Sequence, residues 1–129
     1  MSDLPGQRGY GKDVAETAWY HVAHIQGLAV VTAGGDVDAR TVQQFHHAVT
    51  EAAGMSSRMV IDLGHVTFID STGLGVLIAA RNQAQQRGAG VALVSPPPMV
   101  RRLLTTTQLQ HLFTVHDRLA DAITTPTSQ

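Results

Sequence analysis

The chain has no cysteine and almost no lysine. Without cysteine it forms no disulfide and offers neither a thiol nucleophile nor a thiolate metal ligand. Its one lysine, Lys12, lies near the N-terminus and outside every apolar segment. The core therefore lacks the amine that a phosphate-binding loop of the Walker type or a Schiff base requires.

Clustered positive charge and long apolar runs are also scarce. The formal net charge is −1, and the only adjacent pair of cations is Arg101 with Arg102. Binding to a nucleic-acid backbone needs a basic face, so we expect no direct binding of nucleic acid. No apolar run approaches the roughly 18 residues of a membrane span, and residues 1–6 lack the features of a signal peptide. We therefore expect a cytoplasmic protein without a membrane span.

The residues that are present suit one compact domain. The chain has 129 residues and is 43% hydrophobic, enough to bury roughly two thirds of its unfolded surface. Residues 1–17 are rich in glycine and polar side chains without apolar periodicity, so they are predicted to form a flexible tail. The domain is expected to span residues 18–123, followed by a frayed end at 124–129.

Apolar periodicity predicts an α/β fold with a mixed, mostly parallel sheet, an N-terminal strand pair and about four helices. Strands are predicted at residues 19–24, 28–33, 58–63, 91–95 and 113–115, and helices at 38–54, 71–86, 96–104 and 117–123. In this interpretation Gln26 and Gly27 form the turn of the strand pair. Asp38 caps the first helix and Asp117 caps the last.

Parallel strands bring their strand-to-helix loops to one edge of the sheet. Three predicted loops, residues 35–38, 65–72 and 95–98, should therefore form one surface. The polar side chains expected there as neighbours are Asp36, Asp38, Asp70, Ser71 and Thr72.

Ser71 lies at the predicted junction of a strand and a helix, but the sequence motifs of known enzymes match this position poorly. A hydrolase elbow needs a glycine two residues before the serine, where this chain has Ile69. A dinucleotide fingerprint needs a third glycine where this chain has Ile78, and an aspartic protease needs a second carboxylate loop. The position alone is compatible with an ordinary helix cap or with a site of regulatory phosphorylation.

The histidines form no convincing metal site. His46 and His47 are adjacent and diverge on a helix, whereas His47 and Glu51 share a face but supply only two ligands. We expect no metal.

Residues 60–63 and 68–77, with the central run Asp-Ser-Thr-Gly-Leu-Gly, resemble the signature of STAS domains, specifically the anti-sigma factor antagonists of bacteria. The Gly-Asp-Val-Asp turn at 35–38 and the apolar pattern of residues 100–115 also resemble this family, and the likeness covers roughly residues 18–123. One departure is Gln108, where many relatives carry glycine, so a less left-handed turn is expected there.

The resemblance implies a switch between protein partners. In such families an unphosphorylated antagonist binds an anti-sigma factor that has a GHKL-type serine kinase fold, and this releases the sigma factor. The kinase inactivates the antagonist by phosphorylation, and a PP2C-type phosphatase reverses it. By motif position the acceptor here is Ser71. The resemblance places in the docking surface Asp36, Asp38, Asp70, Thr72, Gly73 and Leu74.

The same resemblance implies that ATP and Mg²⁺ belong to the partner, so this chain is expected to need no cofactor and to have no catalytic activity. Two other functions remain open. The fold also serves as a STAS subunit of lipid or anion transport systems, which need no phosphorylatable serine. It also serves as a nucleotide-sensing module.

Overall fold

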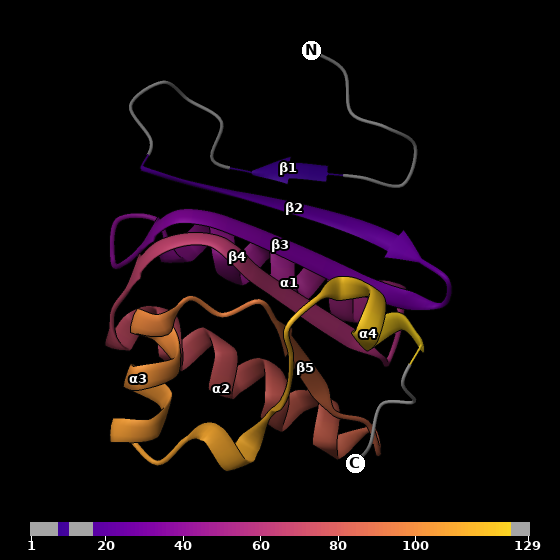
Figure 1. The fold of residues 1–129 in the computed structure, drawn as a ribbon. Helices are drawn as coiled ribbons and strands as arrows, with labels where there is room; N and C mark the ends of the chain where they lie inside the picture. Colours follow the sequence, from indigo (N-terminus) through magenta and orange to yellow (C-terminus); the bar gives the residue numbers. More distant parts are fainter. Residues whose placement is uncertain (1–7, 11–16, 125–129) are drawn as a thin grey trace.

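The computed structural model describes residues 8–10 and 17–124 as a mixed sheet covered by helices (Figure 1). The strands are β1 Arg8–Tyr10, β2 Ala18–Ile25, β3 Leu28–Val37, β4 Met59–Ile69, β5 Val91–Val94 and β6 Thr114–His116. They lie in the sheet in sequence order. The pairs β1–β2 and β2–β3 are antiparallel, and the remaining neighbours are parallel. The predicted mostly parallel sheet with an antiparallel N-terminal pair is confirmed.

Three helices connect the parallel strands: α1 Val42–Met55, α2 Ser71–Gln86 and α3 Pro98–Thr106, the last followed by a 3-10 turn η1 at Gln110–Leu112. A fourth helix, α4 Leu119–Thr124, follows β6. Both ends of α2 are as predicted. Because α1, α2 and α3 each follow a parallel strand, their first turns gather at the carboxyl edge of the sheet. No helix in the described part of the chain is long and apolar enough to cross a membrane.

Two apolar layers hold the helices on the sheet. The larger layer lies between the sheet and α1, α2 and α3; in it the buried Tyr20 ring stacks on Phe45 with 5.1 Å between ring centroids. On the opposite face, Ala122 of α4 packs with Val30 and Val60. Figure 1 shows α1 behind the sheet and α4 in front of it. Helices thus cover both faces of the sheet. The candidate site lies at the carboxyl edge of this sheet.

The turn between β2 and β3 forms as predicted. Gln26 and Gly27 have φ angles of 50° and 82°, and Ile25 pairs directly with Leu28. Two central residues with positive φ are typical of a type I′ hairpin turn, whose twist matches that of the strands.

Strands β3 and β4 are longer than predicted. Gly34 and Gly35, expected to follow the strand, lie within β3, and most of the predicted loop at 65–72 is the end of β4. The pairing of β3 with β4 has register shifts, and it continues past the point where the apolar pattern of the sequence is interrupted. Gly34 permits a close approach, because a Cβ there would lie 2.2 Å from the Trp19 ring. The predicted strand ends were therefore wrong.

The predicted tail contains a strand that the sequence pattern did not indicate: β1 pairs with β2. The rest of the tail before Thr17, and the predicted frayed end beyond Thr124, lie outside the described residues. Thr124 itself is the last residue of α4.

Two predicted details of helix ends are wrong. Gln108 is left-handed, with φ 60°; its N–H donates to the Thr105 carbonyl at 3.0 Å, and the Leu109 N–H donates to the Leu104 carbonyl at 2.8 Å. This is the Schellman pattern, which closes α3 without glycine. Asp117 lies two residues before α4, and its carboxylate accepts a 2.8 Å bond from Arg101.

Candidate functional site

The starts of α1 and α2 meet beside the ends of β3 and β4. The parallel register pairs Asp36 with Phe68 and Val37 with Ile69, and the Asp70 N–H donates to the Val37 carbonyl at 3.2 Å. The predicted convergence of the acidic turn with residues 70–72 is therefore confirmed.

Asp70 caps α2. Its Oδ1 accepts bonds from the backbone N–H groups of Thr72 and Gly73, at 3.0 and 3.2 Å, and from the Thr72 hydroxyl at 2.5 Å. The Thr72 hydroxyl is the main cause of the lowered pKa of Asp70, with the two backbone donors adding to it and desolvation opposing it. Asp70 is thus held ionised where the helix dipole favours a negative charge.

Ser71 is the first residue of α2 and is exposed. Because Asp70 occupies the cap position, the ordinary interpretation of Ser71 as the helix cap is wrong. Within the part of the chain that the structure describes, the Ser71 hydroxyl has no hydrogen-bond partner. A hydroxyl in this position is available to another protein or to a phosphoryl donor.

Gly73 and Leu74 lie beneath this surface. Both are buried, and a Cβ on Gly73 would lie 2.6 Å from Ile69 Cγ1 and 2.9 Å from Val37 Cγ1. The glycine lets α2 start close against the sheet, and the Leu74 side chain belongs to the core. Their contact with a partner stays a prediction.

The prediction that Asp38 caps α1 is wrong. The helix begins at Val42, and Asp38 instead accepts a 3.0 Å bond from the Arg40 N–H and a 2.9 Å ion pair from its guanidinium. The Arg40 side chain is the main cause of the lowered pKa of Asp38. Arg40 is a cation of the site that the sequence analysis missed, although an acid and a base two residues apart were a visible signal.

A buried threonine fixes the acidic turn. The Thr41 hydroxyl donates to the Asp36 carbonyl at 3.0 Å and lies 3.0 Å from the Tyr20 hydroxyl in the core. The Asp36 carboxylate accepts a 2.6 Å bond from the Thr67 hydroxyl of β4. The turn is thus attached to both the core and the neighbouring strand.

An apolar groove borders the same edge. Phe68 is 44% exposed, the only large apolar side chain so exposed among the described residues. It lines a groove of about 330 Å³ together with Ile69, Met99, Arg102, Leu103 and Thr106. The Arg102 guanidinium has no hydrogen-bond or ion-pair partner in the described part of the chain. The sequence analysis missed this groove because it depends on how α3 packs beside the end of β4.

The surroundings of His65 and the distribution of possible metal ligands bear on other chemistry at the carboxyl edge. The His65 ring, which lies near the end of β4, packs against Trp19 with 5.5 Å between the ring centroids. Across residues 8–10 and 17–124, no three His, Asp or Glu side chains are grouped so that they could hold a metal ion.

Comparison with known proteins agrees with this geometry. The STAS domain family model matches residues 20–122. The anti-sigma-F factor antagonist RsfB of Mycobacterium tuberculosis is 32% identical over 80% of this chain and 84% of its own length. The anti-sigma F factor antagonist of Paenibacillus polymyxa is 28% identical over 78% of this chain and 88% of its own.

A solved structure gives the same result in three dimensions. The anti-sigma factor antagonist of Mycobacterium paratuberculosis superimposes with a TM-score of 0.75 and 30% identity, over 83% of this chain and 92% of its own. The resemblance seen in residues 60–63 and 68–77 is thereby confirmed, and the chain belongs to the STAS domain family.

Proposed function

We propose that this chain is an anti-sigma factor antagonist that is inactivated by phosphorylation of Ser71. The observation that carries the proposal is the exposed Ser71 hydroxyl, without a described hydrogen-bond partner, at the start of α2 and beside an apolar groove. The names of the relatives support the antagonist function.

The proposed docking surface consists of Ser71 and Thr72, the acidic residues Asp36, Asp38 and Asp70, and the groove around Phe68. Burial of the half-exposed Phe68 ring would supply apolar contact area, and the unpaired Arg102 would attract an acidic side chain of the partner. Arg40 neutralises Asp38, so Asp36 and Asp70 carry the acidic character of this surface.

Phosphorylation at this position acts through charge. A phosphoryl group adds roughly −1.5 to −2 charges. The N–H groups of Thr72 and Gly73 already donate to Asp70, so they are not available to the phosphoryl group, which would stand beside an ionised carboxylate. A partner surface complementary to a neutral hydroxyl would be repelled, and about 3 kcal/mol of repulsion lowers affinity about a hundredfold.

The proposed partner is an anti-sigma factor with a GHKL-type serine kinase fold, which holds ATP and Mg²⁺. The kinase transfers the γ-phosphoryl group of ATP to Ser71 Oγ, the hydroxyl proton is lost, and ADP leaves. A PP2C-type phosphatase hydrolyses the phosphoserine. This chain supplies the acceptor and the docking surface in the cytoplasm and carries out no catalysis.

The test combines partner capture with reconstitution. The full chain, immobilised, is incubated with lysate of the native host; we expect it to retain a GHKL-type ATPase, identified by mass spectrometry. The purified partner with ATP and Mg²⁺ should then place one phosphate on Ser71 and lose affinity about a hundredfold.

Two variants serve as controls. Ser71→Ala should receive no phosphate and remain bound in the presence of ATP, whereas Thr72→Val should still be phosphorylated at Ser71. Phosphorylation of Ser71→Ala to wild-type stoichiometry would show that the acceptor is another residue. Retention of membrane transport proteins alone would favour the transporter subunit, and tight binding of GTP or ATP by the isolated chain would favour the nucleotide sensor.

A further inference from the structure

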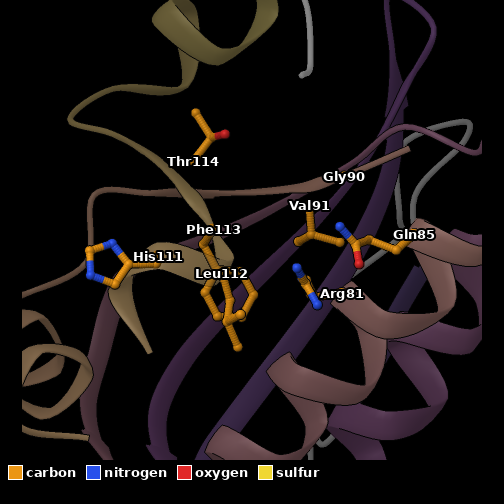
Figure 2. A pocket seen from close by; sticks show the side chains of 8 residues that line it. All are labelled: Arg81, Gln85, Gly90, Val91, His111, Leu112, Phe113 and Thr114. Carbon is orange, nitrogen blue, oxygen red and sulfur yellow. The ribbon is translucent and has the colours of Figure 1, made fainter. Parts of the chain in front are cut away.

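A second cavity lies far from the proposed docking surface. It has a volume of about 170 Å³ and lies between the second half of α2 and the segment from η1 to β6 (Figure 2). Val91 and Thr114, which line it, begin β5 and β6. The cavity is therefore at the amino edge of these strands, whereas Ser71 is at the carboxyl edge. Arg81 follows Ser71 by ten residues, about 15 Å along the helix.

The polar side chains that line this cavity are Arg81, Gln85, His111 and Thr114, and none of them is an acid. Arg81 and Gln85 are four residues apart on one face of α2, and Figure 2 shows their head groups directed toward the same space near Val91. The single described bond of the Arg81 guanidinium runs from Nη1 to Asn82 Oδ1, at 3.2 Å. No carboxylate lines the cavity, so the Arg81 guanidinium stands there without a counter-ion.

Apolar side chains form the part of the lining that faces Arg81. Leu112 and Phe113 lie across from Arg81 in Figure 2, and Val91 closes the cavity at the sheet. One permanent cation beside apolar side chains suits a singly charged ligand with a hydrocarbon body. A phosphate dianion would require more donors than the one guanidinium and the amide that lie together here. The His111 ring and the Thr114 hydroxyl also line the cavity, but Figure 2 shows them apart from these two head groups.

We propose that this cavity binds a small organic carboxylate, with the carboxylate on Arg81 and Gln85 and the hydrocarbon body against Leu112 and Phe113. A guanidinium fork binds a carboxylate in bidentate geometry. The site does not involve Ser71 or the groove around Phe68, so it is independent of the proposed antagonist function.

The test is a titration of the full chain, labelled with nitrogen-15, followed by amide resonances. Acetate, isovalerate and benzoate are the probes, with isovaleramide as the neutral analogue of isovalerate and inorganic phosphate as the other anion. We expect saturable shifts at Val91, Phe113 and Thr114 with isovalerate or benzoate, at a Kd of about 0.1–10 mM for ligands of this size. Isovaleramide and phosphate should bind at least about tenfold more weakly.

Matched variants in and just after α2 complete the test. Arg81→Gln should weaken carboxylate binding at least about tenfold. Arg87→Gln removes the guanidinium of the residue that caps the C-terminus of α2 and bonds the Ala53 carbonyl, and it should leave carboxylate binding unchanged. The proposal is overturned if none of the three carboxylates gives saturable shifts at this cavity. It is equally overturned if isovaleramide or phosphate binds as well, or if Arg81→Gln binds normally.

Discussion

Asp70 and Ser71 are adjacent in the chain, but their side chains have different surroundings. Asp70 accepts three hydrogen bonds at the start of α2, and Ser71 has no described partner. One residue stabilises the helix while its neighbour remains available for modification. A substitution at Ser71 should therefore affect binding with little effect on the fold.

Denaturation of single variants measures how much each of these two side chains contributes to stability. We expect Asp70→Ala to lower the free energy of unfolding by about 1–2 kcal/mol, because the N–H groups of Thr72 and Gly73 lose their acceptor. Ser71→Ala should change it by less than about 0.5 kcal/mol. Urea denaturation of both variants and the wild type checks this. If Ser71→Ala were the more destabilising change, Ser71 would be the cap in solution.

The charge of Asp70 should make stability depend on pH. Its folded pKa is lowered, chiefly by the Thr72 hydroxyl, so the folded state favours the ionised form. This stabilisation is present above the unfolded pKa, about 3.9, and is lost as the pH falls through the lower folded pKa. Asp70→Asn keeps the cap but cannot ionise. The wild type should therefore be more stable than Asp70→Asn at pH 6, and the difference should shrink between about pH 5 and pH 2; a constant difference would contradict this.

At the scale of elements, helix α2 has the predicted bounds. Gly88, with φ 75°, ends it, whereas its start is capped by Asp70 and not by Ser71. Strand β4 was predicted too short because its second half owes its strand structure to pairing with β3, across a register irregularity near Gly34. Strand structure that depends on pairing with another strand is not marked by a periodic pattern of apolar residues in the sequence. The unpredicted β1 has the same cause.

The ends of α2 and α3 allow a matched comparison. Both close with the Schellman pattern, but the left-handed position holds Gly88 in one helix and Gln108 in the other. A residue with a Cβ is strained at φ 60°. We expect Gln108→Gly to raise the free energy of unfolding by about 0.5–1 kcal/mol.

The same substitution inside a helix is the control. Gln83→Gly, on the exposed side of α2, should lower stability by about 0.5–1 kcal/mol. Both variants are compared with the wild type by urea denaturation. A loss of stability in Gln108→Gly would mean that the glutamine side chain contributes more than its backbone strain costs.

For the whole molecule, the strand order places the two candidate sites at opposite edges of the sheet. The carboxyl edge could be predicted as a surface from the parallel pattern alone, and Asp36 and Asp70 indeed lie there. The Asp38–Arg40 ion pair and the groove around Phe68 could not. Both depend on where α1 begins and how α3 packs, which are properties of the packed molecule.

Strand β4 contributes one side chain to the proposed docking surface and another to the core. Phe68 and Leu63 both belong to β4, but Phe68 is 44% exposed and Leu63 is fully buried. We expect Phe68→Ala to change the free energy of unfolding by about 1 kcal/mol or less while weakening binding of the anti-sigma partner by about 1–3 kcal/mol. Leu63→Ala should instead cost about 2–5 kcal/mol of stability, because it leaves a cavity in the core.

Urea denaturation and calorimetric titration with the captured partner, on the same protein preparations, test both expectations. The partner affinity of Leu63→Ala is measured at a temperature where the variant is still folded. A Phe68→Ala variant that binds the partner as tightly as the wild type would exclude the groove from the interface. Recognition would then rest on residues 70–72 and the acidic turn, and the exposure of Phe68 would need another explanation. A tenfold or greater loss of affinity with unchanged stability would place the groove within the docking surface.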